Sequence, residues 1–113
     1  MHEMSLAENV LQIIEESAHA QDFRRVRCVV LEIGELAAVE PDAMRFCFDA
    51  VTRGTIADGA TLQIMETPGA GRCLACDTDV AMHERYGLCP YCGSPRLQVT
   101  AGDQMRVKNL AVE

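Results

Sequence analysis

Four cysteines in two C-x-x-C pairs are the residues of this sequence best suited to chemistry. Cys73 and Cys76 form one pair, Cys89 and Cys92 form the other, and twelve residues separate the pairs. Two residues between paired cysteines let both thiolates bind one ion from a single tight turn, and a hairpin can bring the second pair round to complete a tetrahedron. Four soft thiolates in a closed shell favour Zn²⁺ and leave no coordination position open for catalysis. The spacing therefore predicts a structural zinc site.

Two disulfides, or a thioredoxin-type redox pair, are the competing interpretations of these cysteines. Neither of them explains a paired repeat of this form. Gly93, directly after the last cysteine, favours the zinc interpretation, because glycine readily adopts the positive φ that a turn around sulfur often requires.

A second group of possible metal ligands begins the chain, as Met1, His2 and Glu3. The amine of Met1, the backbone nitrogen of His2 and the His2 imidazole can chelate one metal through consecutive small rings. Glu3 can add a fourth donor, through its backbone or its carboxylate. A tetragonal set of nitrogen and oxygen ligands favours Ni²⁺ or Cu²⁺ over Zn²⁺. The alternative is an incidental histidine with no metal.

The remaining cysteines, histidines and one glutamate have simpler interpretations. Cys28 and Cys47 lie on apolar faces, where a free cysteine behaves as a small hydrophobic residue. His19 is expected to be solvated on the polar face of a helix. His83 is expected to be exposed, with a place beside the zinc site as the alternative. Glu40 is either a solvated carboxylate or a group that approaches the N-terminal residues.

Composition limits the possible functions. The chain has 113 residues, the length of one ordinary domain, and 49% of them are hydrophobic. Its formal net charge is −7, and four zinc-bound thiolates would make it more negative. Such a field repels phosphates, so nucleic-acid binding is disfavoured. No apolar window approaches the length of a membrane span, and the first residues do not resemble a signal peptide. Unpaired thiols that bind metal are typical of the reducing cytoplasm, which is the expected location.

The hydrophobic pattern predicts two helices and three strands outside the cysteine region. A capping box from Ser5 to Glu8 is expected to start the first helix and to leave the first four residues as a short arm. Pro41 suits the first position of the second helix. The helices are predicted at residues 6–21 and 41–53, and the strands at 24–33, 60–66 and 104–112.

These elements predict an α+β fold, a small three-stranded sheet with two helices plus an inserted zinc-ribbon module of rubredoxin-like type. Turn-forming residues at 68–71 and 101–103 mark the ends of the insert. Residues 1–69 and 102–113 are therefore expected to form one α/β domain that presents the N-terminal ligands. Residues 70–101 are expected to form a zinc-binding domain inserted before the last strand.

Several motifs together resemble the HypA/HybF family of nickel chaperones for [NiFe]-hydrogenase maturation. The resemblance covers essentially the whole chain and rests on the opening residues 1–6, the stretches 33–36 and 39–41, and the cysteine quartet followed by Gly93 and Ser94. It implies that His2 binds nickel, that Glu3 tunes this site, and that the four cysteines bind structural zinc. Asp77 stands where many relatives are expected to have glycine, so the first cysteine turn is expected to differ.

The resemblance also implies a partner and a client. Members of the family work with a GTPase, HypB, to deliver nickel to the precursor of the hydrogenase large subunit, and some also serve urease and its maturation proteins. The sequence contains no Ser-His-Asp set and no glycine loop for phosphate, so we expect a metallochaperone and not an enzyme. The alternative function is a zinc-ribbon module for protein interactions, with no nickel role.

Overall fold

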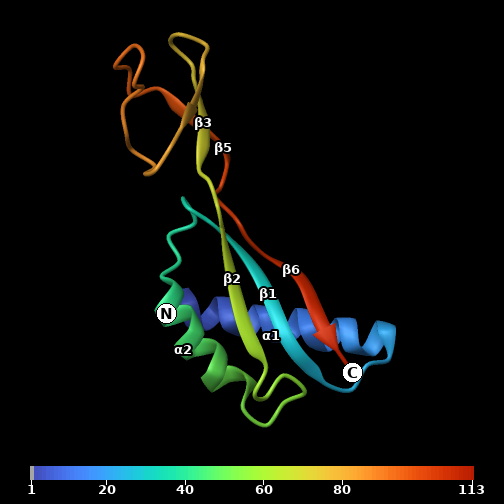
Figure 1. Cartoon of the computed structure of the whole chain (residues 1–113). Coiled ribbons are helices and arrows are strands. Elements are labelled where there is room, and N and C mark those ends of the chain that lie inside the picture. Colours follow the sequence, from blue (N-terminus) through green and yellow to red (C-terminus); the bar gives the residue numbers. More distant parts are fainter. Residues whose placement is uncertain (1) are drawn as a thin grey trace. The chain divides into compact units, whose positions relative to one another are not determined.

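The computed structural model describes residues 2–113 and contains two helices and six strands in that part of the chain (Figure 1). The strands form two three-stranded sheets, with orders β2-β1-β6 and β4-β3-β5. This arrangement confirms the predicted α+β class. The elements are α1 (His2–Gln21), β1 (Val26–Gly34), α2 (Pro41–Thr52), β2 (Thr61–Thr67), β3 (Ala70–Cys73), β4 (Asp79–Ala81), β5 (Leu97–Ala101) and β6 (Met105–Val112).

The chain divides into two compact units, the helical unit and the cysteine unit. The helical unit comprises the residues up to Leu31 together with Val39–Ile64 and Val107–Glu113. The cysteine unit comprises Glu32–Ala38 and Met65–Arg106. In sequence, β3, β4 and β5 all lie between β2 and β6.

The core of the helical unit is mainly aliphatic, as the scarcity of aromatic residues predicts. α1 and α2 pack against each other (Figure 1). Cys47 is buried, which confirms its interpretation as a small hydrophobic residue, and Cys28 is half-buried. Ile13 lies outside this core and remains 44% exposed, because the buried side of α1 consists of Ala7, Val10 and Ile14. The fully buried residues of the helices and of β1 include Ala7, Val10, Ile14, Val29, Leu31, Met44 and Phe48.

The first helix begins earlier than the capping box predicted. α1 starts at His2, so Ser5 and Glu8 lie inside the helix and residues 2–4 do not form a free arm. Glu3 gives the first turn an acidic side chain near the positive end of the helix dipole. Its carboxylate also accepts a hydrogen bond from the backbone N–H of Glu40, at 3.3 Å. This contact spans 37 residues, so a local cap motif could not predict it.

The start of α2 agrees with the prediction that Pro41 occupies the first turn. Glu40 is the N-cap residue, and its carboxylate accepts a 2.7 Å hydrogen bond from the N–H of Ala43. This bond satisfies one of the N–H groups that a helix start leaves without a partner. The same residue thus uses its side chain to cap α2 and its N–H to hold Glu3.

The cysteine unit is built on an antiparallel sheet with a small core. β3 pairs with β4 on one side and with β5 on the other, and Gly71 lies opposite Val80 and Val99. A Cβ at Gly71 would lie 2.2 Å from the sulfur of Met82 and 2.8 Å from the carbonyl oxygen of Gln98, so a larger residue would require both the side chain and the neighbouring backbone to shift. The buried cluster consists of Leu36, Cys73, Val80, Met82 and Cys89, with Leu97 and Val99 packed against it.

Neither helix of the described chain is both long enough and apolar enough to cross a bilayer.

Candidate metal centre

The four cysteines of the two C-x-x-C pairs meet at one point of the cysteine unit. Their sulfur atoms all lie within 4.8 Å of one another. The Sγ atoms of Cys73 and Cys92 are 3.5 Å apart, and those of Cys76 and Cys89 are 3.8 Å apart. A tetrahedron with Zn–S bonds of about 2.3 Å has S–S edges of about 3.8 Å. The cluster can therefore hold a metal ion such as zinc.

Two similar turns present these sulfur atoms. In the first, the N–H of Asp77 donates to the carbonyl of Cys73 at 2.8 Å, and in the second, the N–H of Gly93 donates to the carbonyl of Cys89 at 2.8 Å. Both residues have positive φ, 61° for Asp77 and 76° for Gly93. The prediction for Gly93 is confirmed. Asp77 adopts the same left-handed conformation as Gly93, because aspartate tolerates this conformation better than most residues.

The pKa values of Cys73 and Cys92 indicate that the cluster needs a bound cation before all four thiols ionise. The N–H of Cys76 is the main cause that lowers the pKa of Cys73 to about 6. The N–H of Ser94 acts in the same direction on Cys92, but the Cys73 thiol and burial outweigh it and raise the pKa of Cys92 to about 12. Adjacent thiolates repel one another, so the four do not ionise together without a cation. A bound divalent cation removes this conflict, and thiol ligands are deprotonated when they bind it.

Arg72 supports the first cysteine turn, a role that was not predicted from the sequence. Its guanidinium contacts the carboxylate of Asp77 at 2.8 Å and that of Asp79 at 2.9 Å. Hydrogen bonds to these two carboxylates raise the pKa of Arg72. Arg72 precedes the first cysteine, and Asp77 is the residue with positive φ in the first turn. The guanidinium therefore ties the end of β3 to the start of β4 around that turn.

We expect Arg72→Ala to release zinc faster than the parent chain, because the first cysteine turn loses its side-chain support. Exposed ion pairs contribute little, so the rate of zinc transfer to a competing chelator should rise only about two- to fivefold. Arg96→Ala is the matched control, since the hydrogen bonds of Arg96 in this unit use only its backbone. Equal transfer rates in the two variants would show that Arg72 does not hold the turn.

His2 and Glu3 lie in the first turn of α1. The side chain of His2 is 57% exposed, and its Nδ1 lies 3.8 Å from Oε2 of Glu3. The N–H of Glu40, followed by the N–H of Glu3 itself, lowers the pKa of the Glu3 carboxyl. Glu3 therefore stays ionised beside the exposed imidazole. Met1 lies outside the described residues.

The position of His2 at the start of α1 also affects its backbone nitrogen, which the sequence suggests as a metal donor. The first N–H groups of a helix have no carbonyl partner one turn earlier, so the amide of His2 is not held by an intrahelical bond. The positive end of the helix dipole disfavours a cation by roughly 0.3–1 kcal/mol. The carboxylates of Glu3 and Glu40, both at this end of the unit, oppose that effect.

The two other histidines lie apart from the cysteine cluster. His19 is exposed near the end of α1, as expected. The side chain of His83 is 80% exposed, which confirms the simpler interpretation, and its Nδ1 lies 2.6 Å from Oε2 of Glu35. The N–H of Gly69 is the first cause that lowers the pKa of Glu35, and His83 is the second. Within residues 2–113, the four cysteines are the group in which three or more His, Cys, Asp or Glu side chains lie close enough to share one metal ion.

A small α+β fold with a zinc-ribbon-like cysteine site defines a class of small metal-binding proteins, and comparison with known proteins defines the family. A family model described as "Hydrogenase/urease nickel incorporation, metallochaperone, hypA" matches residues 1–112. The chain belongs to this HypA family. The hydrogenase maturation factor HypA of Azotobacter vinelandii is 60% identical over the whole of both chains. That of Dechloromonas aromatica is 56% identical, again over the whole of both chains.

Two solved structures have the same fold. The solution structure of the Ni metallochaperone HypA from Helicobacter pylori matches with a TM-score of 0.73 and 24% identity, covering 97% of this chain and 96% of that chain. A solution structure described as HypA protein matches with a TM-score of 0.72 and 26% identity, covering 100% of this chain and 97% of that chain. The HypA family, to which the chain belongs, is described as one of metallochaperones for nickel incorporation into hydrogenase and urease.

Proposed function

We propose that the chain binds Ni²⁺ through Met1, His2 and Glu3 and delivers it, with a partner GTPase of the HypB type, to the [NiFe]-hydrogenase large-subunit precursor. Zn²⁺ at Cys73, Cys76, Cys89 and Cys92 is a structural ion in this proposal. The observation that carries the proposal is the exposed His2 imidazole beside a carboxylate that the N–H of Glu40 holds in place.

The hydrogen bond that Glu3 accepts supports a nickel site whose carboxylate is held in place before the metal binds. A carboxylate that already accepts a backbone hydrogen bond loses less conformational freedom when a cation arrives. Its charge lies next to an imidazole whose other atoms remain open to solvent. The amine of Met1, the amide nitrogen of His2 and the imidazole complete a nitrogen-rich set, which suits Ni²⁺ better than Zn²⁺. Glu40 is the first residue to examine for a further donor, because its carboxylate belongs to the same end of the helical unit.

The ligands of the zinc site indicate that this chain does not hydrolyse nucleotide itself in this proposal. The zinc site has four protein ligands, so it offers no open position for catalysis. Nucleotide hydrolysis is therefore assigned to the partner GTPase.

We also propose that residues 1–69 and 102–113 form one domain and that residues 70–101 form an inserted zinc domain. The proposed location is the cytoplasm, where thiols stay reduced. Urease maturation proteins are further candidate partners, since the family model covers urease as well as hydrogenase.

Equilibrium nickel titration of the zinc-loaded chain with a free N-terminus tests this proposal. We expect one nickel per chain, bound in addition to one zinc. A protein that retains zinc and folds normally but binds no nickel near one equivalent would instead be a zinc-ribbon module for protein interactions.

Nickel binding should weaken steeply on mild acidification. Protons compete for imidazole and α-amine nitrogens, whose reference pKa values are about 6.5 and about 7.7 to 8.0, so affinity should fall at least about tenfold between pH 7.5 and pH 6.5. Glu3 does not cause this loss. Its pKa is lowered below the ordinary 4.5, so the carboxylate stays ionised and its contribution disappears only in more acidic solution.

Calorimetry at several pH values measures this slope, and the retained zinc is the internal control. Zinc should stay bound across the same range, because its thiolates are already deprotonated by the metal. A nickel affinity that is flat between these pH values would indicate carboxylate ligands in place of the two nitrogens.

A further inference from the structure

The cysteine unit exposes large apolar side chains that its small core does not use. The exposed fractions are 50% for Leu74, 95% for Tyr86, 64% for Leu88 and 72% for Tyr91. These four are half of the exposed large apolar residues in the described chain, and all lie within residues 74–91. Leu74 and Tyr91 lie within the two C-x-x-C turns, and the other two lie on the loop between them. Contiguous exposed apolar surface marks an interaction site more often than isolated apolar residues do, so the surface around these residues is a candidate.

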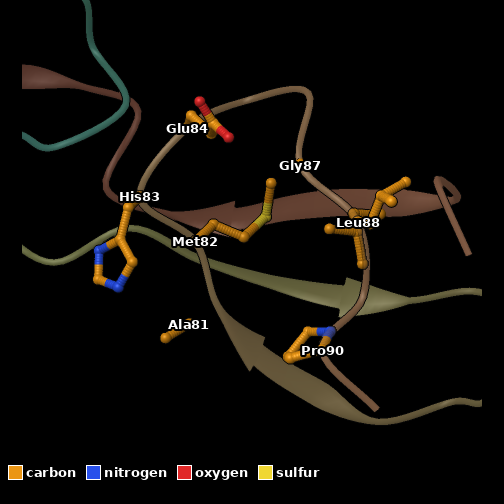
Figure 2. Close-up of a pocket in the computed structure, with 8 residues that line it drawn as sticks. Ala81, Met82, His83, Glu84, Gly87, Leu88 and Pro90 are labelled. Atoms are coloured by element: carbon orange, nitrogen blue, oxygen red, sulfur yellow. The ribbon is translucent and has the colours of Figure 1, made fainter. Parts of the chain in front are cut away.

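A groove of about 320 Å³ lies on this loop (Figure 2). Met82 is buried at its base, whereas Leu88 and Pro90 are exposed at its side. Figure 2 shows the Met82 side chain directed toward the loop that carries Gly87 and Leu88, while the His83 ring points away from this group. The lining residues are Ala81, Met82, His83, Glu84, Gly87, Leu88, Pro90 and Leu97. The groove therefore offers an open, partly apolar site that one aliphatic or aromatic side chain can enter.

The charge beside the groove is negative. Glu84 is exposed and is the only carboxylate among its lining residues in the described chain. The neighbouring cation is directed elsewhere, because Nε of Arg85 donates to the carbonyl of Leu36 at 3.1 Å. His83 faces Glu35. The whole chain carries a formal charge of −7, so its field also attracts cationic segments.

We propose that this groove is a docking site for a segment of a partner protein that carries one large apolar side chain next to a lysine or arginine. The apolar side chain enters between Met82, Leu88 and Pro90, and the cation lies beside Glu84. None of these residues belongs to the cysteine cluster or to the N-terminal site. The proposal therefore goes beyond nickel binding and can fail without affecting it.

NMR titration of the full zinc-loaded chain with short acetylated and amidated peptides tests the proposal. The probe peptide is Gly-Lys-Leu-Lys-Gly, and the comparison peptides have Glu in place of both Lys, or Ala in place of Leu. We expect the probe to shift the amide signals of residues 82–90 and to bind at least about fivefold more tightly than either comparison peptide, because each lacks one of the two contacts.

Two variants locate the site. Leu88→Ser should weaken binding of the probe about fivefold or more, and Glu84→Gln should remove the preference for Lys over Glu in the peptide. Phe46→Ser is the control, because Phe46 is 74% exposed but lies on α2 of the helical unit. The zinc content of each variant verifies that the cysteine unit is intact.

Three results would overturn the proposal. The first is equal binding of all three peptides, or no binding at millimolar concentration. The second is a set of shifts outside the groove, or loss of binding in the Phe46 variant. The third is a parent chain that dimerises in sedimentation experiments and becomes monomeric on Leu88→Ser, since the occupant would then be a second copy of this chain.

Discussion

Replacing Cys76 or Cys92 with alanine is expected to release zinc and unfold the cysteine unit, while the helical unit keeps its secondary structure. Structural zinc supplies roughly 10–16 kcal/mol in small zinc modules, which makes metal binding their main folding energy. The buried cluster of this unit has five residues, and two of them, Cys73 and Cys89, are themselves cysteines of the site. Little apolar core remains to hold the sheet without the metal. Metal analysis combined with amide hydrogen exchange measures both effects.

Cys28→Ala is the matched control for these substitutions. Cys28 is half-buried on β1 and lies outside the cluster of four sulfur atoms, so this variant should retain one zinc per chain. The exchange protection of residues 70–101 should then equal that of the parent. Full zinc retention in both the Cys76 and the Cys92 variants would exclude a closed site with four thiolates.

Replacing His2 with alanine is expected to abolish specific nickel binding without unfolding the chain. The substitution removes an imidazole that is 57% exposed and contacts only Glu3 among the described ion pairs, so stability should change little. Glu3→Gln should have a smaller effect, a loss of about 10- to 100-fold in affinity, because this variant removes one carboxylate but keeps the backbone of residue 3 and the nitrogen ligands. The loss for His2→Ala should exceed this range. Equilibrium dialysis with nickel compares the variants.

The other two histidines provide matched controls. His19 and His83 are both exposed, so alanine at either position should leave one nickel per chain. Loss of nickel in the His83 variant with retention in the His2 variant would move the site to the neighbourhood of Glu35 and remove the N-terminal proposal.

The local features of this fold could be predicted from sequence, because each depends on residues that are close in the chain. The C-x-x-C spacing determines which sulfur atoms can share one ion, and the structure brings these four together. Gly93 indicates the turn after the second cysteine pair, because glycine readily adopts the positive φ that this turn has. Pro41 indicates the start of α2, because its φ suits a first helical turn.

Contacts between distant residues could not be predicted in this way. The capping box at Ser5 predicted a later start for α1, whereas a tertiary hydrogen bond from Glu40 to Glu3 accompanies an earlier one. Glutamate is not among the preferred N-cap residues, so the capping role of Glu40 had little sequence signal, although its approach to the N-terminal residues was one of the two alternatives expected. Arg72 could have been noticed from the pattern Arg-Cys followed by Asp77 and Asp79, but only the antiparallel pairing of β3 with β4 shows that one guanidinium reaches both carboxylates.

The most direct test of nickel binding at the N-terminus compares the chain that has a free Met1 amine with one that is extended by two glycines before Met1. The extension keeps every side chain but converts that amine into an amide, which is a poor donor until it is deprotonated. Calorimetric titration of both zinc-loaded proteins at pH 7.5 measures their affinities for nickel, and the same two glycines added after Glu113 are the control. We predict one tightly bound nickel in the parent and the control, and loss of this site in the N-terminally extended chain. Equal affinity in the extended chain would show that the amine is not a ligand and would contradict the proposed nickel site.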